Sequence, residues 1–201
     1  MMQFPTGPFG CILADPPWPF RTYGGDDIAP TQGAQPYDVM SMDAIKALPV
    51  SRAAARDCAL LMWVVDSNLP DAMDLGAAWG FDFKTVAFVW AKTDGIGMGY
   101  WTRKQTEQCW LFTRGSPKRL DKGVPQIIEC GRGIHSEKPW VTHAYAQKLV
   151  DGPYLEMFAR SKQPGWASWG NQVGDAAPLL SAMQRPGTGK RMASGRQEGS
   201  E

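Results

Sequence analysis

The sequence predicts an α/β fold built on a mostly parallel, doubly wound sheet. Short apolar runs of strand length alternate with segments of helical periodicity, as in parallel strands joined by helical crossovers. Two of the runs, Cys11 to Ala14 and Cys58 to Val65, are apolar at every position. Strands buried on both faces of a parallel sheet have this pattern.

The size and composition of the chain fit one globular domain. It has 201 residues, of which 43% are hydrophobic and 20% charged, enough for one core. No apolar run approaches the roughly 18 residues of a membrane span, and the N-terminus lacks the pattern of a secretory signal. We expect a cytoplasmic protein with a folded domain over 1–173. The Gly-, Ser- and Arg-rich segment 174–201 is expected to be a disordered tail.

The cysteine and histidine content argues against a metal site. The four cysteines are far apart, no C-x-x-C pair occurs, and the chain has only two histidines. Zinc sites and disulfide frameworks need closer or more regular spacing. We therefore expect no metal, and cysteines that act as small core residues in a reducing compartment.

The stretch Asp15-Pro16-Pro17-Trp18 follows the first apolar run. Each proline fixes its own φ and lacks a backbone donor, so the strand must end there. Asp15 is therefore expected at the carboxyl end of a central strand, where open α/β sheets bind ligands. A carboxylate, rigidly aimed carbonyl groups and an indole suit a planar base with an exocyclic amine. Taken alone, a capping aspartate and a core tryptophan explain the stretch about equally well.

The remaining elements follow in order along the chain. Ser41 is a plausible N-cap for a helix over 41–48. Pro70 in the first turn and Gly80 at the end delimit a helix over 69–80. We expect strands at 83–91, 108–113, 126–130 and 154–159, and a last helix at 140–150. The strand at 108–113 is expected to be the antiparallel partner in a hairpin near the sheet edge.

Lys138 and Pro139 stand directly before the last expected helix. Proline is favoured in the first turn of a helix, and a cation beside helix N-terminal amides forms an anion site. A simple capping loop is the alternative interpretation.

Charge is informative only in its distribution. The net charge of +1 does not indicate a nucleic-acid partner, but basic residues crowd one segment: Arg103, Lys104, Arg114, Lys118, Arg119 and Lys122. A local basic surface is the usual footprint of phosphate binding, although a solvated loop explains it nearly as well. The irregular segment 19–40, with Tyr23 near its start, is expected to be a lid or a base-binding loop.

Together these pieces resemble the MT-A70 family of adenine N6-methyltransferases, whose signature is Asp-Pro-Pro-Trp after an apolar strand. A family pattern of glycines, tryptophan, a basic residue and glutamate matches Gly97, Gly99, Trp101, Arg103 and Glu107. H-S-x-K-P before the last helix and the segment from 155 to 172 complete the resemblance, which covers residues 8–173. It implies a Rossmann-like class I methyltransferase fold with a circularly permuted motif order and one antiparallel edge hairpin.

The resemblance also implies S-adenosyl-L-methionine as the cofactor. Lys138 would meet its carboxylate, with His135 a weaker candidate, and Asp15 is assigned to the cofactor site as well. Phe158, Arg160, Asn171 and Gln172 would lie at the ribose and neighbouring atoms. Amides and a guanidinium can bond vicinal hydroxyls.

The implied catalytic residues are Asp15, Pro16, Pro17 and Trp18. Asp15 and the carbonyl near Pro16 would accept the N–H bonds of the adenine amine, and Trp18 would stack on the base. Tyr23, Trp101, Arg103 and Lys104 complete the expected substrate-binding set. For Trp101 and Arg103, a core tryptophan and a surface arginine are an equal alternative.

The sequence favours a site-specific DNA adenine-N6 methyltransferase of a bacterial or phage-infected cell. DNA is favoured over RNA because no RNA-binding module or zinc knuckle accompanies the compact domain. An RNA enzyme and an inactive nucleic-acid-binding subunit remain alternatives, and a homo- or hetero-oligomer is possible. Cytosine-N4 enzymes fit less well, because they typically carry serine before the prolines.

Overall fold

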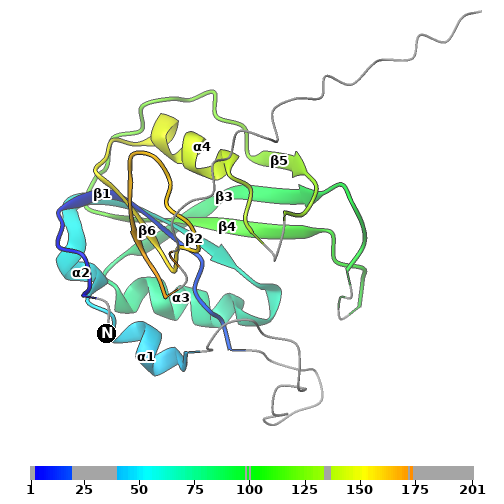
Figure 1. Ribbon diagram of the computed structural model, residues 1–201, viewed down its shortest axis with the longest axis horizontal. Coiled ribbons are helices and arrows are strands. Elements are labelled where there is room, and N and C mark those ends of the chain that lie inside the picture. The colour runs from blue at the N-terminus through cyan, green and yellow to red at the C-terminus, as the bar shows by residue number, and fades with distance from the viewer. Residues whose placement is uncertain are drawn as a thin grey trace, which may run out of the picture.

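The computed structural model describes residues 3–19, 40–97, 99, 101–133, 137–171 and 173 (Figure 1). In this part of the chain, a seven-stranded sheet has the order β5-β3-β4-β2-β1-β6-β7. The strands are β1 Phe9–Ala14, β2 Ala54–Val64, β3 Asp82–Lys92, β4 Thr106–Arg114, β5 Ile127–Cys130, β6 Tyr154–Met157 and β7 Trp166–Trp169.

The sheet is mostly parallel, as the sequence predicts. β1 pairs in parallel with β2 and β6, β6 with β7, and β3 with β5. β4 is antiparallel to both β2 and β3, so the expected antiparallel hairpin is present. It does not form the edge itself, because the short strand β5 pairs outside β3.

Helices cover both faces of the sheet (Figure 1). They are α1 Met42–Lys46, α2 Val50–Ala53, the 3-10 turn η1 Asp66–Asn68, α3 Leu69–Ala78 and α4 Val141–Leu149. Ile45, Val50 and Leu75 pack into one core cluster with one face of the sheet. Ala146 of α4 packs into a second cluster with the other face. Successive side chains of β1 point alternately into the first and the second cluster, which explains why the run from Cys11 to Ala14 is apolar at every position.

Local chemistry sets the ends of these elements. Ser41 accepts a side-chain hydrogen bond from the backbone N–H of Ala44, which confirms it as the N-cap of α1. Pro70 lies in the first turn of α3. Inside α3, a Cβ at Gly76 would lie 2.4 Å from the ring of Phe112, so glycine lets this helix pack directly on β4.

The sheet has a topological switch point between β1 and β6. The chain leaves β1 for β2 on one side, whereas it leaves β6 for β7 on the other. Because β1 and β6 are parallel neighbours, their carboxyl ends, Ala14 and Met157, lie side by side. Ligands of open α/β sheets bind in the crevice at such a point.

Some details differ from the sequence prediction. β6 ends at Met157 because Phe158 takes a positive φ of 61°, where the prediction continued the strand to 159. β7 and α2 were not predicted. Cys11, Cys58 and Cys109 are free and buried, and burial raises the pKa of Cys58 to about 12. The expected tail, 174–201, lies outside the described residues.

Candidate functional site at the carboxyl ends of β1 and β6

The corner after β1 is rigid. Pro16 is buried, and its carbonyl accepts the backbone N–H of Trp18 at 2.8 Å. The indole N–H of Trp18 donates to the carbonyl of Trp63 at 3.0 Å, and the side chain is only 9% exposed within the first core cluster. In this structure Trp18 anchors the corner to β2 and offers little surface for the stacking expected of it. Asp15 remains half-buried at the end of the strand.

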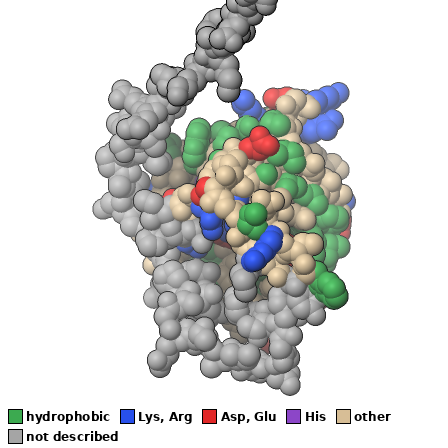
Figure 2. Space-filling view, turned by 90° about the vertical axis from the view of Figure 1, so that its right-hand side faces the viewer, with side chains coloured by type: hydrophobic (Ala, Val, Ile, Leu, Met, Phe, Trp, Pro, Cys, Tyr) green, Lys and Arg blue, Asp and Glu red, His purple; other side chains and the backbone are tan. Residues whose placement is uncertain are grey.

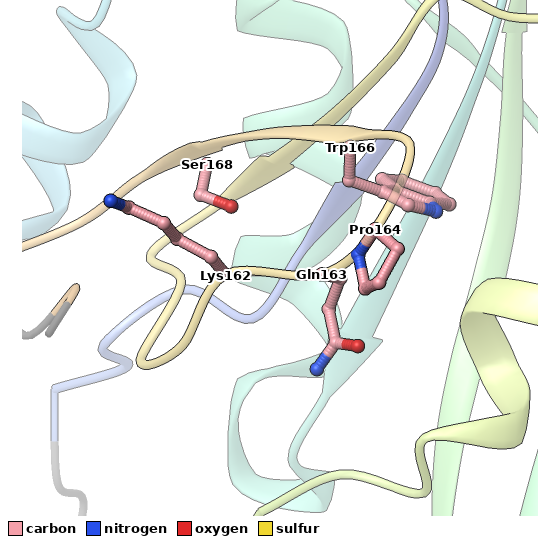
Figure 3. Close-up of a pocket in the computed structure, with 5 residues that line it drawn as sticks. All are labelled: Lys162, Gln163, Pro164, Trp166 and Ser168. Atoms are coloured by element: carbon pink, nitrogen blue, oxygen red, sulfur yellow. The ribbon is translucent and has the colours of Figure 1, made fainter. Parts of the chain in front are cut away.

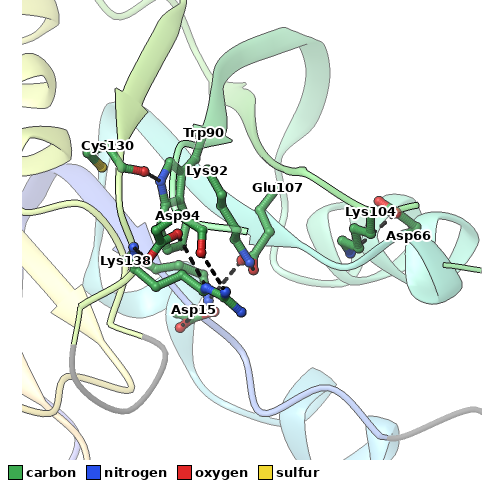
Figure 4. Close-up of polar contacts among 10 residues, drawn as sticks. Asp15, Asp66, Trp90, Lys92, Asp94, Lys104, Glu107, Cys130 and Lys138 are labelled. Atoms are coloured by element: carbon green, nitrogen blue, oxygen red, sulfur yellow. Dashed lines mark hydrogen bonds and ion pairs between the residues drawn. The ribbon is translucent and has the colours of Figure 1, made fainter. Parts of the chain in front are cut away.

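A chain of four charged side chains begins at Asp15 (Figure 4). The ammonium of Lys138 lies 2.9 Å from Asp15 Oδ2 and 3.4 Å from Glu107 Oε2. The other oxygen of Glu107 is hydrogen-bonded to Lys92. We call Asp15, Lys138, Glu107 and Lys92 the charged cluster. Each of its side chains is about a quarter exposed or less, so the two acids and two bases balance one another largely out of solvent.

The charges in this cluster hold one another ionised. Burial alone would lower the pKa of Lys138, but Asp15 and Glu107 raise it above its ordinary value. Burial would likewise raise the pKa of Glu107, but Lys138 and Lys92 hold it below its ordinary value. A buried ion pair of this kind is costly to break, because removing one partner leaves an uncompensated charge.

Lys138 stands where an anion is best received. It lies two residues before Trp140, the N-cap of α4, and the positive end of the helix dipole adds to the charge of the lysine. The amides of Thr142 and His143 in the first turn donate to the carbonyls of Pro139 and Trp140. The ammonium of Lys138 also lies 5.9 Å from the centre of the Trp63 ring. Lys138 therefore joins three elements at the switch point: β1 through Asp15, β4 through Glu107, and α4.

The ends of β6 and β7 are joined through the backbone rather than by charges. The amide of Ala159 donates to the carbonyl of Trp169 at 3.0 Å. A Cβ at Gly170 would lie 2.3 Å from the carbonyl oxygen of Ala159, so no other residue fits without a backbone shift. Phe158, in its left-handed conformation, has its ring 5.7 Å from that of Trp169. We call this contact between Phe158–Ala159 and Trp169–Gly170 the β6–β7 apex.

These features match a known family. The MT-A70 family model matches residues 9–172. The chain belongs to the MT-A70 family.

Members of this family from distant organisms are similar to the chain. The chain is 32% identical to the type II methyltransferase M.MunI of Mycoplasma sp, over 86% of this chain and 81% of that protein. It is 26% identical to the mouse N(6)-adenine-specific methyltransferase METTL4, over 82% of this chain but 37% of that protein. The N6-methyladenosine RNA methyltransferase MTA1 of Cryphonectria parasitica is also 26% identical, over 82% of this chain and 52% of that protein.

The structure brings together some of the residues assigned from the MT-A70 resemblance. Asp15 and Lys138 meet directly. Phe158 lies at the β6–β7 apex, and Asn171, which is exposed, follows Gly170 there. Arg160 is half-buried just beyond the end of β6. Tyr23, His135 and Gln172 lie outside the described residues.

Sequence reasoning missed the roles of Lys92 and Glu107. Glu107 appears in the family pattern without an assigned role, and Lys92 directly follows the strand expected at 83–91. The available signal was position: Lys92 ends β3, which is parallel to β1 through the sheet, and Glu107 begins the antiparallel β4. Charged residues at these places meet at the ligand-binding end of the sheet.

The expected basic surface between Trp101 and Lys122 is not one surface. Arg103 and Lys104 precede β4, whereas Arg114 is its last residue, and nine residues of strand span roughly 30 Å. The guanidinium of Arg114 binds the carbonyl of Ser51 at that far end. On the face seen in Figure 2, lysine and arginine side chains form separate groups with apolar side chains between them.

An open pocket lies beside the site, against β7 (Figure 3). It has a volume of about 510 Å³ and is lined by Lys162, Gln163, Pro164, Trp166 and Ser168. None of the predicted site residues lines it. Among the described residues, the buried Ser168 Oγ and Trp166 Nε1 atoms have no hydrogen-bond partner. This pocket belongs to the segment that joins β6 to β7, outside the charged cluster.

Within the described parts of the chain, no group of three or more histidine, cysteine, aspartate or glutamate residues could hold a metal ion. Among the same residues, no helix has the length and apolar character needed to cross a membrane.

Proposed function

We propose that this MT-A70 family member transfers the methyl group of S-adenosylmethionine to N6 of adenine in nucleic acid, with DNA as the favoured substrate. The observation that carries the proposal is the Asp15–Lys138 pair at the switch point. An acceptor for an amine and a cation for a carboxylate stand there 2.9 Å apart.

The residues present fit the cofactor. The ammonium of Lys138, beside the first turn of α4, suits the amino-acid carboxylate. Across the switch point, the β6–β7 apex presents Phe158 and the exposed Asn171, a ring and an amide suited to the nucleoside part. When bound, S-adenosylmethionine supplies a methyl group already activated on a sulfonium, so the protein has chiefly to align the reactants.

Asp15 would work on the acceptor amine. The lone pair of the adenine amine is delocalised into the ring, so the nitrogen is a poor nucleophile. A carboxylate that accepts its N–H bond favours tetrahedral geometry and stabilises the positive charge that develops on nitrogen. Asp15 does not need to deprotonate the neutral amine, because a carboxylate is far too weak a base to do so. The proton leaves after transfer.

Pro16 would provide a second acceptor. Its carbonyl already bonds the amide of Trp18, and the indole of Trp18 is fixed to Trp63. A carbonyl oxygen has two lone pairs, so the remaining one stays available in a fixed direction. In this proposal Trp18 fixes the orientation of the Asp15 carboxylate and the Pro16 carbonyl, and it does not stack on the base.

The comparison with M.MunI favours DNA and a bacterial cytoplasm. It is a type II methyltransferase, a term used for DNA-modifying enzymes, and the match covers 81% of its length. MTA1 relatives are named RNA methyltransferases, and this chain spans about half of the Cryphonectria protein. RNA is therefore the alternative that the test must address.

The test is radiolabelled methyl transfer from S-adenosylmethionine to duplex and single-stranded DNA and to the same forms of RNA, followed by nucleoside mass analysis. We expect N6-methyladenine in DNA. Asp15→Ala should lower transfer at least a hundredfold, because it removes an acceptor made for the transition state. It should still fold and bind the cofactor. Asp82→Asn, at an exposed site on β3, is the matched control and should retain activity.

Three results would contradict the proposal. Full transfer by the Asp15→Ala variant would remove Asp15 from the chemistry. Methylation of RNA alone would reverse the choice of substrate. Nucleic-acid binding without cofactor binding would indicate an inactive binding subunit.

A further inference from the structure

The hairpin that joins β3 to β4 extends from the charged cluster. Lys92 and Glu107, at its base, belong to that cluster. Beyond them, the amide of Lys92 donates to the carbonyl of Gln105 at 2.8 Å, and Gly97 and Lys104 exchange backbone hydrogen bonds of 2.7 and 3.1 Å. The hairpin pairing therefore extends from β3 and β4 as far as Gly97 and Lys104, beyond the bounds of the two strands shown in Figure 1.

The hairpin is fixed in position and tightly turned. The ammonium of Lys104 lies 3.2 Å from Asp66, directly beyond the end of β2 (Figure 4). At the turn, a Cβ at Gly99 would lie 2.0 Å from the carbonyl oxygen of Thr102. Glycine is therefore required for the close approach of these two residues.

This turn exposes a large apolar side chain. Trp101 is 89% exposed and Ile96, on the same hairpin, is 59% exposed. Arg103, a basic residue, is also exposed there. Five residues separate Trp101 from Glu107, so their Cα atoms lie at most about 20 Å apart. An aromatic wedge beside basic groups fits a stacked and negatively charged partner.

An adenine in a duplex cannot present its amine to Asp15 while it is stacked and paired, because enzymes reach such an atom only by extruding the base from the helix. Extrusion leaves a gap in the stack beside the site. We propose that Trp101 inserts into this gap, and that the substrate of this enzyme is therefore duplex rather than single-stranded nucleic acid. The inference rests on the proposed function and adds to it the form of the substrate and the residue that recognises that form.

The test compares Trp101→Ala and Trp101→Phe on matched substrates. Methylated positions are first mapped on unmethylated plasmid DNA with the wild-type protein. Three oligonucleotides then carry that target: a fully paired duplex, a duplex with an abasic site opposite the target adenine, and the single strand. Leu120→Ala is the control, since Leu120 is 44% exposed near the C-terminal end of α4.

We expect Trp101→Ala to lower kcat/KM on the paired duplex at least tenfold. The loss should be less than threefold on the other two substrates, where no pair has to be broken. Trp101→Phe should recover most of the activity on the paired duplex, and Leu120→Ala should match the wild type throughout. An equal loss on all three substrates, or no loss on any, would overturn the inference.

A second readout does not depend on methyl transfer. Stacking of an indole on bases quenches its fluorescence, so duplex DNA should quench the wild-type protein more than Trp101→Phe. The difference should be smaller with single-stranded DNA, on whose bases an exposed indole stacks without insertion. This difference would support the wedge even if transfer failed and the proposed function with it. Equal quenching of the two proteins by duplex DNA would overturn the proposed insertion of Trp101. A change in the oligomeric state of Trp101→Ala, measured by light scattering, would also overturn it, because the indole would then be covered by a second protein chain.

Discussion

The charged cluster and the β6–β7 apex lie at the carboxyl ends of neighbouring strands, but different forces hold them. Lys138 and Asp15 come from segments 123 residues apart and meet through an ion pair of 2.9 Å. The apex joins Ala159 to Trp169 through a backbone hydrogen bond, and Gly170 permits the close approach. In the first region the side chains determine the geometry, and in the second the main chain does.

This difference predicts different sensitivities. An ion pair responds to pH and to the loss of charge, but a long lysine side chain can adjust its position. A backbone contact responds to added volume, because neither strand end can move without breaking the sheet pairing. For the proposed methyltransferase, the adjustable side faces the reacting groups and the rigid side faces the nucleoside.

The largest expected effect comes from adding volume at the apex. Gly170→Ala places a Cβ 2.3 Å from a backbone oxygen, and overpacking of this kind costs about 3 kcal/mol. We expect a urea unfolding midpoint well below that of the wild type, and weaker cofactor binding. Gly133→Ala is the control, since its nearest neighbour would lie at 3.4 Å. If Gly170→Ala unfolded at the same urea concentration as the wild type, the backbone of the β6–β7 apex would have to shift easily enough to accommodate the added Cβ.

The second effect is the loss of the cation. Lys138→Met removes the charge that would bind the cofactor carboxylate, and hydrogen bonds to charged groups contribute about 2 kcal/mol. By calorimetry we expect cofactor affinity to fall roughly thirtyfold. Lys84→Met, which removes an exposed lysine paired with Asp82 on the same strand, should bind as the wild type does. If Lys138→Met bound the cofactor as tightly as the wild type, the carboxylate of the cofactor would not be bound by Lys138.

The smallest effect is a pH dependence that belongs to Glu107. The pKa of Glu107 is below its ordinary value of 4.5 in the folded protein. Its ionised carboxylate therefore stabilises the folded state above pH 4.5, and this stabilisation is lost as the pH falls through the folded pKa. The pKa of Lys138 is above its ordinary value of 10.5. Its charge therefore stabilises the folded state below pH 10.5, and this stabilisation is lost as the pH rises through the folded pKa.

Glu107→Gln separates these contributions. We expect it to lower the free energy of unfolding by only about 1 kcal/mol at neutral pH, because glutamine still accepts a hydrogen bond from a lysine and Asp15 still compensates Lys138. The difference from the wild type should shrink as the pH falls below about 4.5. Urea titrations between pH 3 and 7 measure it. A difference that stays constant over this range would assign the effect to packing rather than to charge.

Much of the fold was predictable because its signals are local. Proline after an apolar run ended β1 as expected, and Ser41 and Pro70 marked the starts of helices. β7 escaped prediction because its four residues contain two tryptophans and no regular alternation of apolar and polar residues. The end of β6 escaped because a positive φ at a phenylalanine has no sequence signal.

The site was predictable only where one segment carries the chemistry. Asp15 and Lys138 each stand at a recognisable boundary, so their assignment needed no tertiary contact. Glu107 draws its role from Lys92 and Lys138 on two other elements, and no single window of sequence contains that arrangement. For Trp18 the sequence left two interpretations open, a base-stacking indole and a core tryptophan, and its hydrogen bond to Trp63 favours the second.

The sharing of Lys138 between two carboxylates has a consequence for binding under the proposed function. With Glu107 still bound to it, the lysine can exchange Asp15 for the carboxylate of an incoming ligand without losing its charge compensation. That exchange would release Asp15 Oδ2, which Lys138 now occupies, and so give the carboxylate more capacity to accept an amine. Cofactor and nucleic acid would then each strengthen the binding of the other.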